Sequence, residues 1–103
     1  MTVRTRLPNR RGSTNFELEV GGLRYTCTFS WFPDNSIAEL FLNNCKSNST
    51  ADVNARDAAI AFSFAVQYGA APEAIRLALS RDTQGRAISP LGVALDLILG
   101  QER

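Results

Sequence analysis

Alternating hydrophobic and polar residues near the start of the chain predict an antiparallel sheet. Residues 14–20 alternate with the period of a half-buried strand. Gly21-Gly22 follows and can supply the positive φ angles of a tight hairpin, so a second strand is expected over residues 23–32. A turn at residues 33–36, rich in Pro, Asp, Asn and Ser, then leads to a third strand over residues 37–43.

Both turns place the same residues on one apolar face. The first register pairs Val20 with Leu23 and the second pairs Phe32 with Ile37. The pairs expected on the apolar face are Leu18–Tyr25, Phe16–Cys27, Trp31–Ala38, Phe29–Leu40 and Cys27–Leu42. The opposite face carries Thr26, Thr28, Ser30, Glu39 and Phe41. Cys27 therefore belongs to the core and Cys45 to the far side, which excludes a disulfide between them.

The run from Asp52 to Gly69 is apolar on nearly its whole circumference and predicts a central buried helix, surrounded by other elements. Its polar side chains Arg56, Ser63 and Gln67 form one narrow stripe, and both Phe62 and Phe64 are expected in the core. Ser49, Thr50 and Asp52 are candidate N-terminal capping residues, and Gly69 stands where a left-handed C-cap is expected.

Two shorter helices complete the pattern. Pro72 opens one that ends by about Arg81, and Ser89-Pro90 opens another that ends at Gly100. The predicted fold class is α+β: a three-stranded antiparallel meander followed by three helices packed on one face. This domain spans residues 14–103, and residues 1–13 are expected to form a flexible basic arm.

Charge sets that arm apart from the rest of the chain. Arg4, Arg6, Arg10 and Arg11 stand there without an acid, although the whole chain carries a net charge of only +1. The arm is a candidate contact for an acidic protein or for nucleic acid, and the alternative is a solvated tail. Among the remaining cations, Lys46, Arg81 and Arg86 lie in two loops that could together bind a phosphate or a nucleotide.

Composition argues against several classes of function. The chain has no histidine and only two cysteines, so we expect no metal, no cofactor and no catalytic centre. No apolar run is long enough for a membrane span or a signal peptide, so we expect no membrane contact and a cytoplasmic location.

Several stretches resemble the TSCPD domain, which is found near the C-terminus of cobalamin-dependent ribonucleotide reductases and as short separate proteins. The resemblance covers about residues 11–79 and is carried by GGLRYTCTFSWFPDNSIAELFLNNCKSNS, by AVQYG at the end of the long helix and by APEAI after it. The family's naming motif, the reductase barrel and the cysteine-rich tail are missing here. The resemblance therefore implies an accessory module and does not carry catalysis over.

The expected function is that of a non-catalytic accessory or interaction module. We expect it to act by protein association, either as a homodimer or as the small partner of a larger protein. Candidate contacts are Phe41, Glu39 and the arginines of the arm, because strands 14–20 and 37–43 would leave open sheet edges and a face that nothing covers. Two alternatives are a small nucleotide- or phosphate-binding protein that uses Lys46, Arg81 and Arg86, and a nucleic-acid-binding protein of a mobile element that uses the arm.

Overall fold

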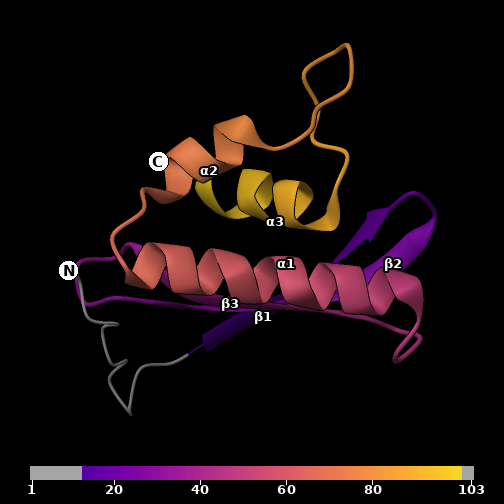
Figure 1. Cartoon of the computed structure of the whole chain (residues 1–103), viewed down its shortest axis with the longest axis horizontal. Helices are drawn as coiled ribbons and strands as arrows, with labels where there is room; N and C mark the ends of the chain where they lie inside the picture. The colour runs from indigo at the N-terminus through magenta and orange to yellow at the C-terminus, as the bar shows by residue number, and fades with distance from the viewer. Residues whose placement is uncertain (1–12, 101–103) are drawn as a thin grey trace.

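The computed structural model describes residues 13–100, and within them it shows a three-stranded antiparallel sheet followed by three helices (Figure 1). The α+β class and the order of its elements are those predicted from the sequence. The strands are neighbours in chain order, so the sheet is a simple meander. The elements are β1 (Ser13–Val20), β2 (Leu23–Trp31), β3 (Ile37–Asn44), α1 (Thr50–Gln67), α2 (Pro72–Ala78) and α3 (Pro90–Leu99).

The first hairpin follows the predicted register. Gly21 and Gly22 have φ angles of 59° and 78°, which are favourable for glycine and match the twist that a two-residue hairpin requires. Val20 lies opposite Leu23, and Glu19 lies opposite Arg24. The apolar side chains of β1 and β2 therefore share the inner face of the sheet, as expected.

The second hairpin departs from the predicted register at one end. Phe29 pairs with Leu40 as expected, but Trp31 pairs with Ile37 and not with Ala38, because a bulge interrupts the ladder beside Ser30. The extra residue of the bulge allows Ile37 and Ala38 to be buried together, which strict alternation would forbid. The predicted pairs Trp31–Ala38 and Phe32–Ile37 are therefore wrong, and the rest of the ladder is confirmed.

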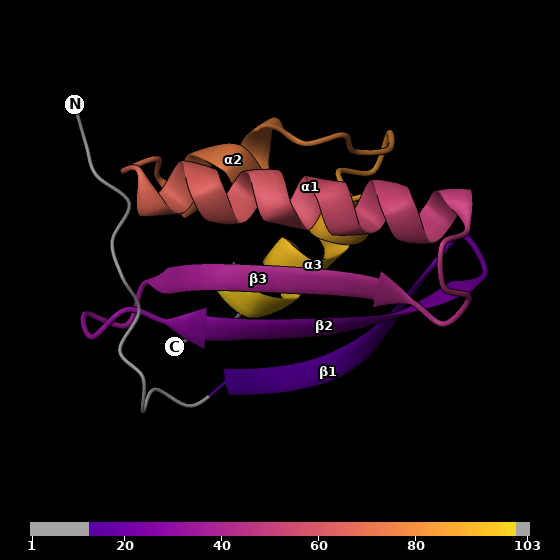
Figure 2. The same cartoon turned by 60° about the horizontal axis from the view of Figure 1, so that its bottom comes forward.

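Helix α1 lies along the edge of β3 (Figure 2). Polar side chains of α1 bond to the backbone of that strand. The Ser63 hydroxyl accepts from the Leu40 amide at 2.9 Å and donates to the Leu40 carbonyl at 3.0 Å. Gln67 Nε2 donates to the Ala38 carbonyl at 2.8 Å. The expectation that β3 leaves an open edge is therefore wrong, because α1 occupies that edge.

The position of α1 also corrects the prediction of a central buried helix. One side of α1 faces the core through Ala55, Ala59, Phe62 and Val66. Ser63 and Gln67 of the polar stripe take the neighbouring side, against β3. Ala51 and Ala58 pack at the edge of the core, and the rest of the circumference faces solvent. Phe64, which was expected in the core, is 46% exposed. The sequence pattern could not show that the buried sides of this helix include its polar stripe.

The ends of α1 are formed largely as predicted. Ser49 is the N-cap, and its hydroxyl accepts from the Asp52 amide at 3.1 Å. Asp52 is itself buried and ties the helix to β3, because its Oδ1 accepts from the Asn44 amide at 2.8 Å. At the other end Gly69 has a φ of 107°, in the left-handed range that favours glycine after a helix.

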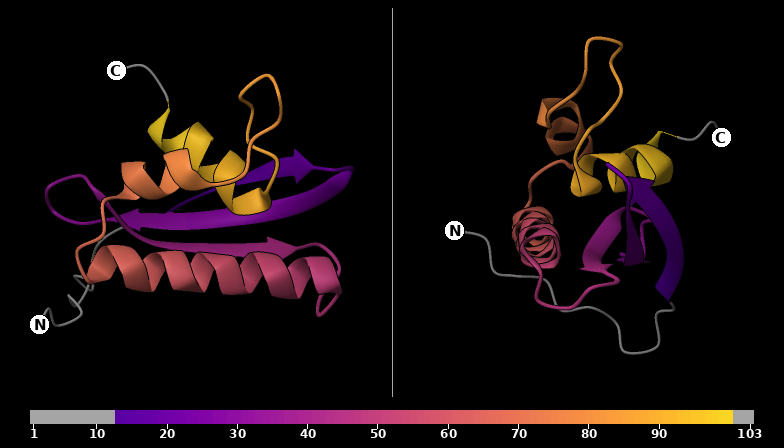
Figure 3. Two further views of the ribbon diagram at one scale, coloured as in Figure 1. Left: turned by 45° about the horizontal axis from the view of Figure 1, so that its top comes forward. Right: turned by 90° about the vertical axis from the view of Figure 1, so that its right-hand side faces the viewer.

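The two short helices complete the inner layer. Helix α3 crosses the inner face of the sheet and reaches β1, while α2 packs on α3 (Figure 3). Ser89 caps α3 by accepting from the Gly92 amide at 3.1 Å. Helix α2 ends at Ala78, earlier than the predicted Arg81. Helices α2 and α3 lie on the inner side of the curved sheet and α1 lies along its β3 edge, so no described element covers the outer face.

Candidate functional site

Phe41 lies on the outer face of the sheet, as predicted. It pairs with Thr28 on β2 and its side chain is 43% exposed, although its neighbours Leu40 and Leu42 are fully buried. Glu39 shares this face opposite Ser30 and is half-buried. The structure thus places both predicted contact residues of the sheet on the face that no element within residues 13–100 covers.

Helix α1 adds two large apolar side chains to that side. Ile60 is 40% exposed and Phe64 is 46% exposed. At 100° per residue, both positions flank the stripe that bonds to β3, on the side away from the core-facing residues of α1. They therefore lie beside β3 on the same side of the molecule as Phe41. We call Phe41, Ile60 and Phe64 the outer patch.

Arg81 is held within the protein by its own neighbours. Its guanidinium donates to both carboxylate oxygens of Asp96, at 2.8 and 2.9 Å, and also to the Gly85 and Arg76 carbonyls. Arg76 donates to the same carboxylate at 2.8 Å. The bond from Arg81 is the main reason that the pKa of Asp96 falls to about 2. This cluster fixes the loop after α2 onto α3, so Arg81 serves the fold.

The other two cations of the predicted anion site are also placed apart. Arg86 pairs with Asp82 at 3.3 Å within the projecting loop between α2 and α3. Lys46 lies in the β3–α1 connection, which is on another part of the molecule in every view (Figures 1 and 3). The structure does not bring Lys46, Arg81 and Arg86 together into one cradle.

The remaining predicted contacts lie outside the described residues. Arg4, Arg6, Arg10 and Arg11 belong to residues 1–12. Within residues 13–100 no three His, Cys, Asp or Glu side chains gather in a way that could hold a metal ion. The same residues include no helix with the length and apolar character that crossing a bilayer requires.

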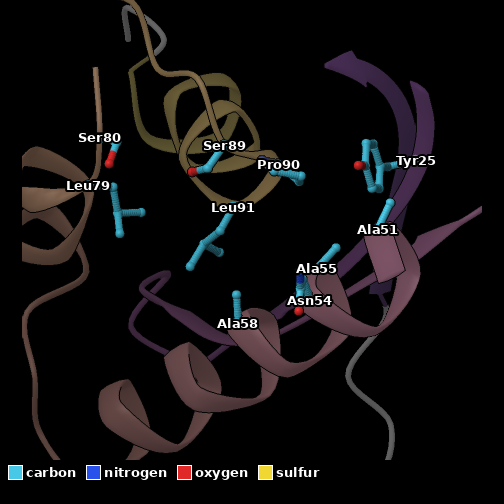
Figure 4. Close-up of a pocket in the computed structure, with 10 residues that line it drawn as sticks. All are labelled: Tyr25, Ala51, Asn54, Ala55, Ala58, Leu79, Ser80, Ser89, Pro90 and Leu91. Atoms are coloured by element: carbon cyan, nitrogen blue, oxygen red, sulfur yellow. The ribbon is translucent and has the colours of Figure 1, made fainter. Parts of the chain in front are cut away.

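Two cavities were not anticipated from the sequence. One, of about 430 Å³, lies between α1, the start of α3 and the segment after α2, and it includes Tyr25 of β2 (Figure 4). The other, of about 500 Å³, lies between α3 and the strands, beside Phe16, Phe29 and Trp31. Elements far apart in the sequence form both cavities, so no short sequence pattern predicts them.

Comparison with protein-family models, with curated proteins and with solved structures returns no match to this chain. The functional interpretation therefore depends on the residues of the chain itself. Sequence reasoning found Phe41 because a large aromatic breaks the polar pattern of its face. It missed Ile60 and Phe64 because they belong to a helix that seemed apolar all round.

Proposed function

We propose that this chain is a non-catalytic interaction module that works by protein association, and that the outer patch is its contact surface. The observation that carries the proposal is that Phe41 and Ile60 are 43% and 40% exposed on the side of the sheet that no described element covers. Grouped apolar side chains of this kind mark protein contacts far more often than scattered ones do. Transfer of their surface from water into an interface is favourable by roughly 25 cal/mol per Å².

The chemistry of the other described residues supports association more than catalysis. The ionic cluster around Asp96 is satisfied within the fold, and neither cavity has a basic side chain in its lining. The resemblance to the TSCPD domain adds a candidate partner system, that of the cobalamin-dependent ribonucleotide reductases. This part of the proposal rests on the sequence resemblance alone.

Light scattering across a concentration series measures the molecular mass in solution and tests whether the partner is a second copy of the chain. If the partner is a second copy, the mass rises toward two chains, and Phe41→Ser or Ile60→Ser restores one chain. Leu77→Ser is the matched control, because Leu77 is 62% exposed on α2, away from the outer face. It should behave like the wild type.

Affinity capture covers a partner of different sequence. Wild-type and Leu77→Ser baits should retain the same protein, and the Phe41→Ser and Ile60→Ser baits should lose it. A mass of one chain at all concentrations, together with identical capture by all four baits, would contradict the proposal.

A further inference from the structure

The cavity beside Tyr25 has the form of a small-molecule site. Its volume of about 430 Å³ is within the range of roughly 300–1,000 Å³ that is usual for ligand pockets. Three alanines of α1, at positions 51, 55 and 58, leave the space, and Leu79 and Leu91 add apolar walls. The pocket therefore suits an apolar body of moderate size.

Tyr25 brings a hydroxyl into this apolar space. The residue is only 4% exposed, and Figure 4 shows its oxygen directed toward the space between α1 and the start of α3. Within residues 13–100 this hydroxyl has no hydrogen-bond partner. A buried tyrosine hydroxyl normally finds a partner, because leaving it without one is costly. The hydroxyl is thus available to a molecule that enters the pocket.

The other polar groups of the lining are uncharged. Ser89 accepts from the Gly92 amide, and its own proton has no acceptor among the described residues. Ser80 and the Asn54 amide lie in the same lining, and no Lys, Arg, Asp or Glu joins them. Such a site does not compensate a charged ligand for the loss of its water.

We propose that this pocket binds a small uncharged molecule with an apolar body and a carbonyl-type oxygen that accepts from the Tyr25 hydroxyl. The pocket lies against Ala55 and Ala58, on the flank of α1 away from Ile60 and Phe64, so the site is separate from the outer patch. It neither requires nor tests the association proposed above.

Three probes of one shape test the proposal by NMR: benzamide, benzoate and toluene, each at millimolar concentration. Benzamide should shift the methyl signals of Ala51, Ala55 and Ala58, benzoate should not, and toluene should bind more weakly. Tyr25→Phe should weaken benzamide binding by about three- to tenfold, as expected for one hydrogen bond. Ala58→Phe should fill the pocket and abolish the shifts, and Ala61→Phe, on the exposed flank of α1, should leave them unchanged.

Thermal unfolding of the free protein checks the state of the hydroxyl independently. Tyr25→Phe should leave the melting temperature unchanged or raise it, because it removes a buried polar group without a partner. A fall of several degrees would show that the hydroxyl is already bonded inside the protein and would overturn the proposal. Absence of any benzamide shift, a shift that Tyr25→Phe does not weaken, or equal binding of benzoate would overturn it as well.

Discussion

At the scale of single residues, the two cysteines show how the pleat of the sheet separates buried chemistry from exposed chemistry. Cys27 points into the core and is fully buried, and Cys45 follows β3 and is exposed. Both are free thiols, as the strand parity predicts. Burial raises the pKa of the Cys27 thiol to about 12, so almost none of it is thiolate at neutral pH.

We therefore expect a thiol reagent to label one cysteine of the native protein. Cys45 should react quickly, and Cys27 should react only at the rate at which the protein unfolds. Mass spectrometry of the labelled peptides at neutral pH measures both rates, and the unfolded protein in denaturant is the control in which both react. Equal rapid labelling of the native protein would show that the inner face of the sheet is assigned wrongly.

At the scale of elements, the polar stripe of α1 fixes the position of this helix as much as its apolar face does. Ser63 and Gln67 form hydrogen bonds with backbone groups of β3 that a further strand would otherwise use. The Asp52 carboxylate accepts from another backbone amide of β3 near the start of the helix. The Asn48 and Asn44 amides donate to this carboxylate and lower the pKa of Asp52. An edge strand is thus closed by side chains, which protects it from pairing with other chains.

Ser63→Ala tests whether Ser63 bonds to β3, because the two possible positions of this side chain predict stability changes of opposite sign. Alanine is the better helix former by up to about 0.7 kcal/mol, so a helix with Ser63 in solvent would gain stability. Here the change leaves the buried amide and carbonyl of Leu40 without partners. We therefore expect the free energy of unfolding, measured in denaturant, to fall by about 1–3 kcal/mol. Ala61→Ser on the exposed side is the control and should lose no more than about 0.7 kcal/mol, the difference in helix propensity. A more stable Ser63→Ala protein would disprove the contact.

The ion pairs of Asp96 on α3 with Arg76 and Arg81 predict how the stability of the protein depends on pH. Because the pKa of Asp96 is about 2 in the folded protein and higher in the unfolded chain, its ionised form stabilises the fold above its ordinary pKa of 3.8. This stabilisation, about 2 kcal/mol, is lost as the pH falls from about 4 to about 2.

Asp96→Asn isolates this carboxylate from the other acids of the chain. The difference in unfolding free energy between the wild type and Asp96→Asn should be largest above about pH 5 and should shrink steadily toward pH 2. Urea unfolding at a series of pH values measures it. A difference that does not change with pH would mean that Arg81 and Arg76 do not hold this carboxylate in solution.

At the scale of the whole molecule, the turn sequences predicted the sheet, and contacts between distant parts of the chain determined the position of α1. The two turns are short and chemically explicit, so they set the strand registers up to the bulge beside Ser30. The position of α1 depends on which element its polar stripe meets, and residues more than twenty positions earlier in the chain decide that. The sequence pattern therefore predicts Phe64 in the core, and the outer patch and the Tyr25 pocket appear only in the three-dimensional structure.

The same packing gives the molecule two sides of different character. The inner side holds the core and the pocket beside Tyr25, where α1 and α3 approach each other. The outer side presents Phe41 beside the exposed flank of α1. Association through the outer side would leave the pocket open, so the two proposed sites can act independently.

Site-specific photo-crosslinking tests the central claim, association through the outer patch, most directly. Benzoylphenylalanine is placed at position 41 or 60 in the patch, or at position 77 on α2 as the control, and the protein is irradiated in the cells that produce it. Positions 41 and 60 should each yield a discrete product with a protein, whether a second copy or another chain, and position 77 should not yield that product. Absence of a product from both patch positions, or the same product from all three, would contradict the account.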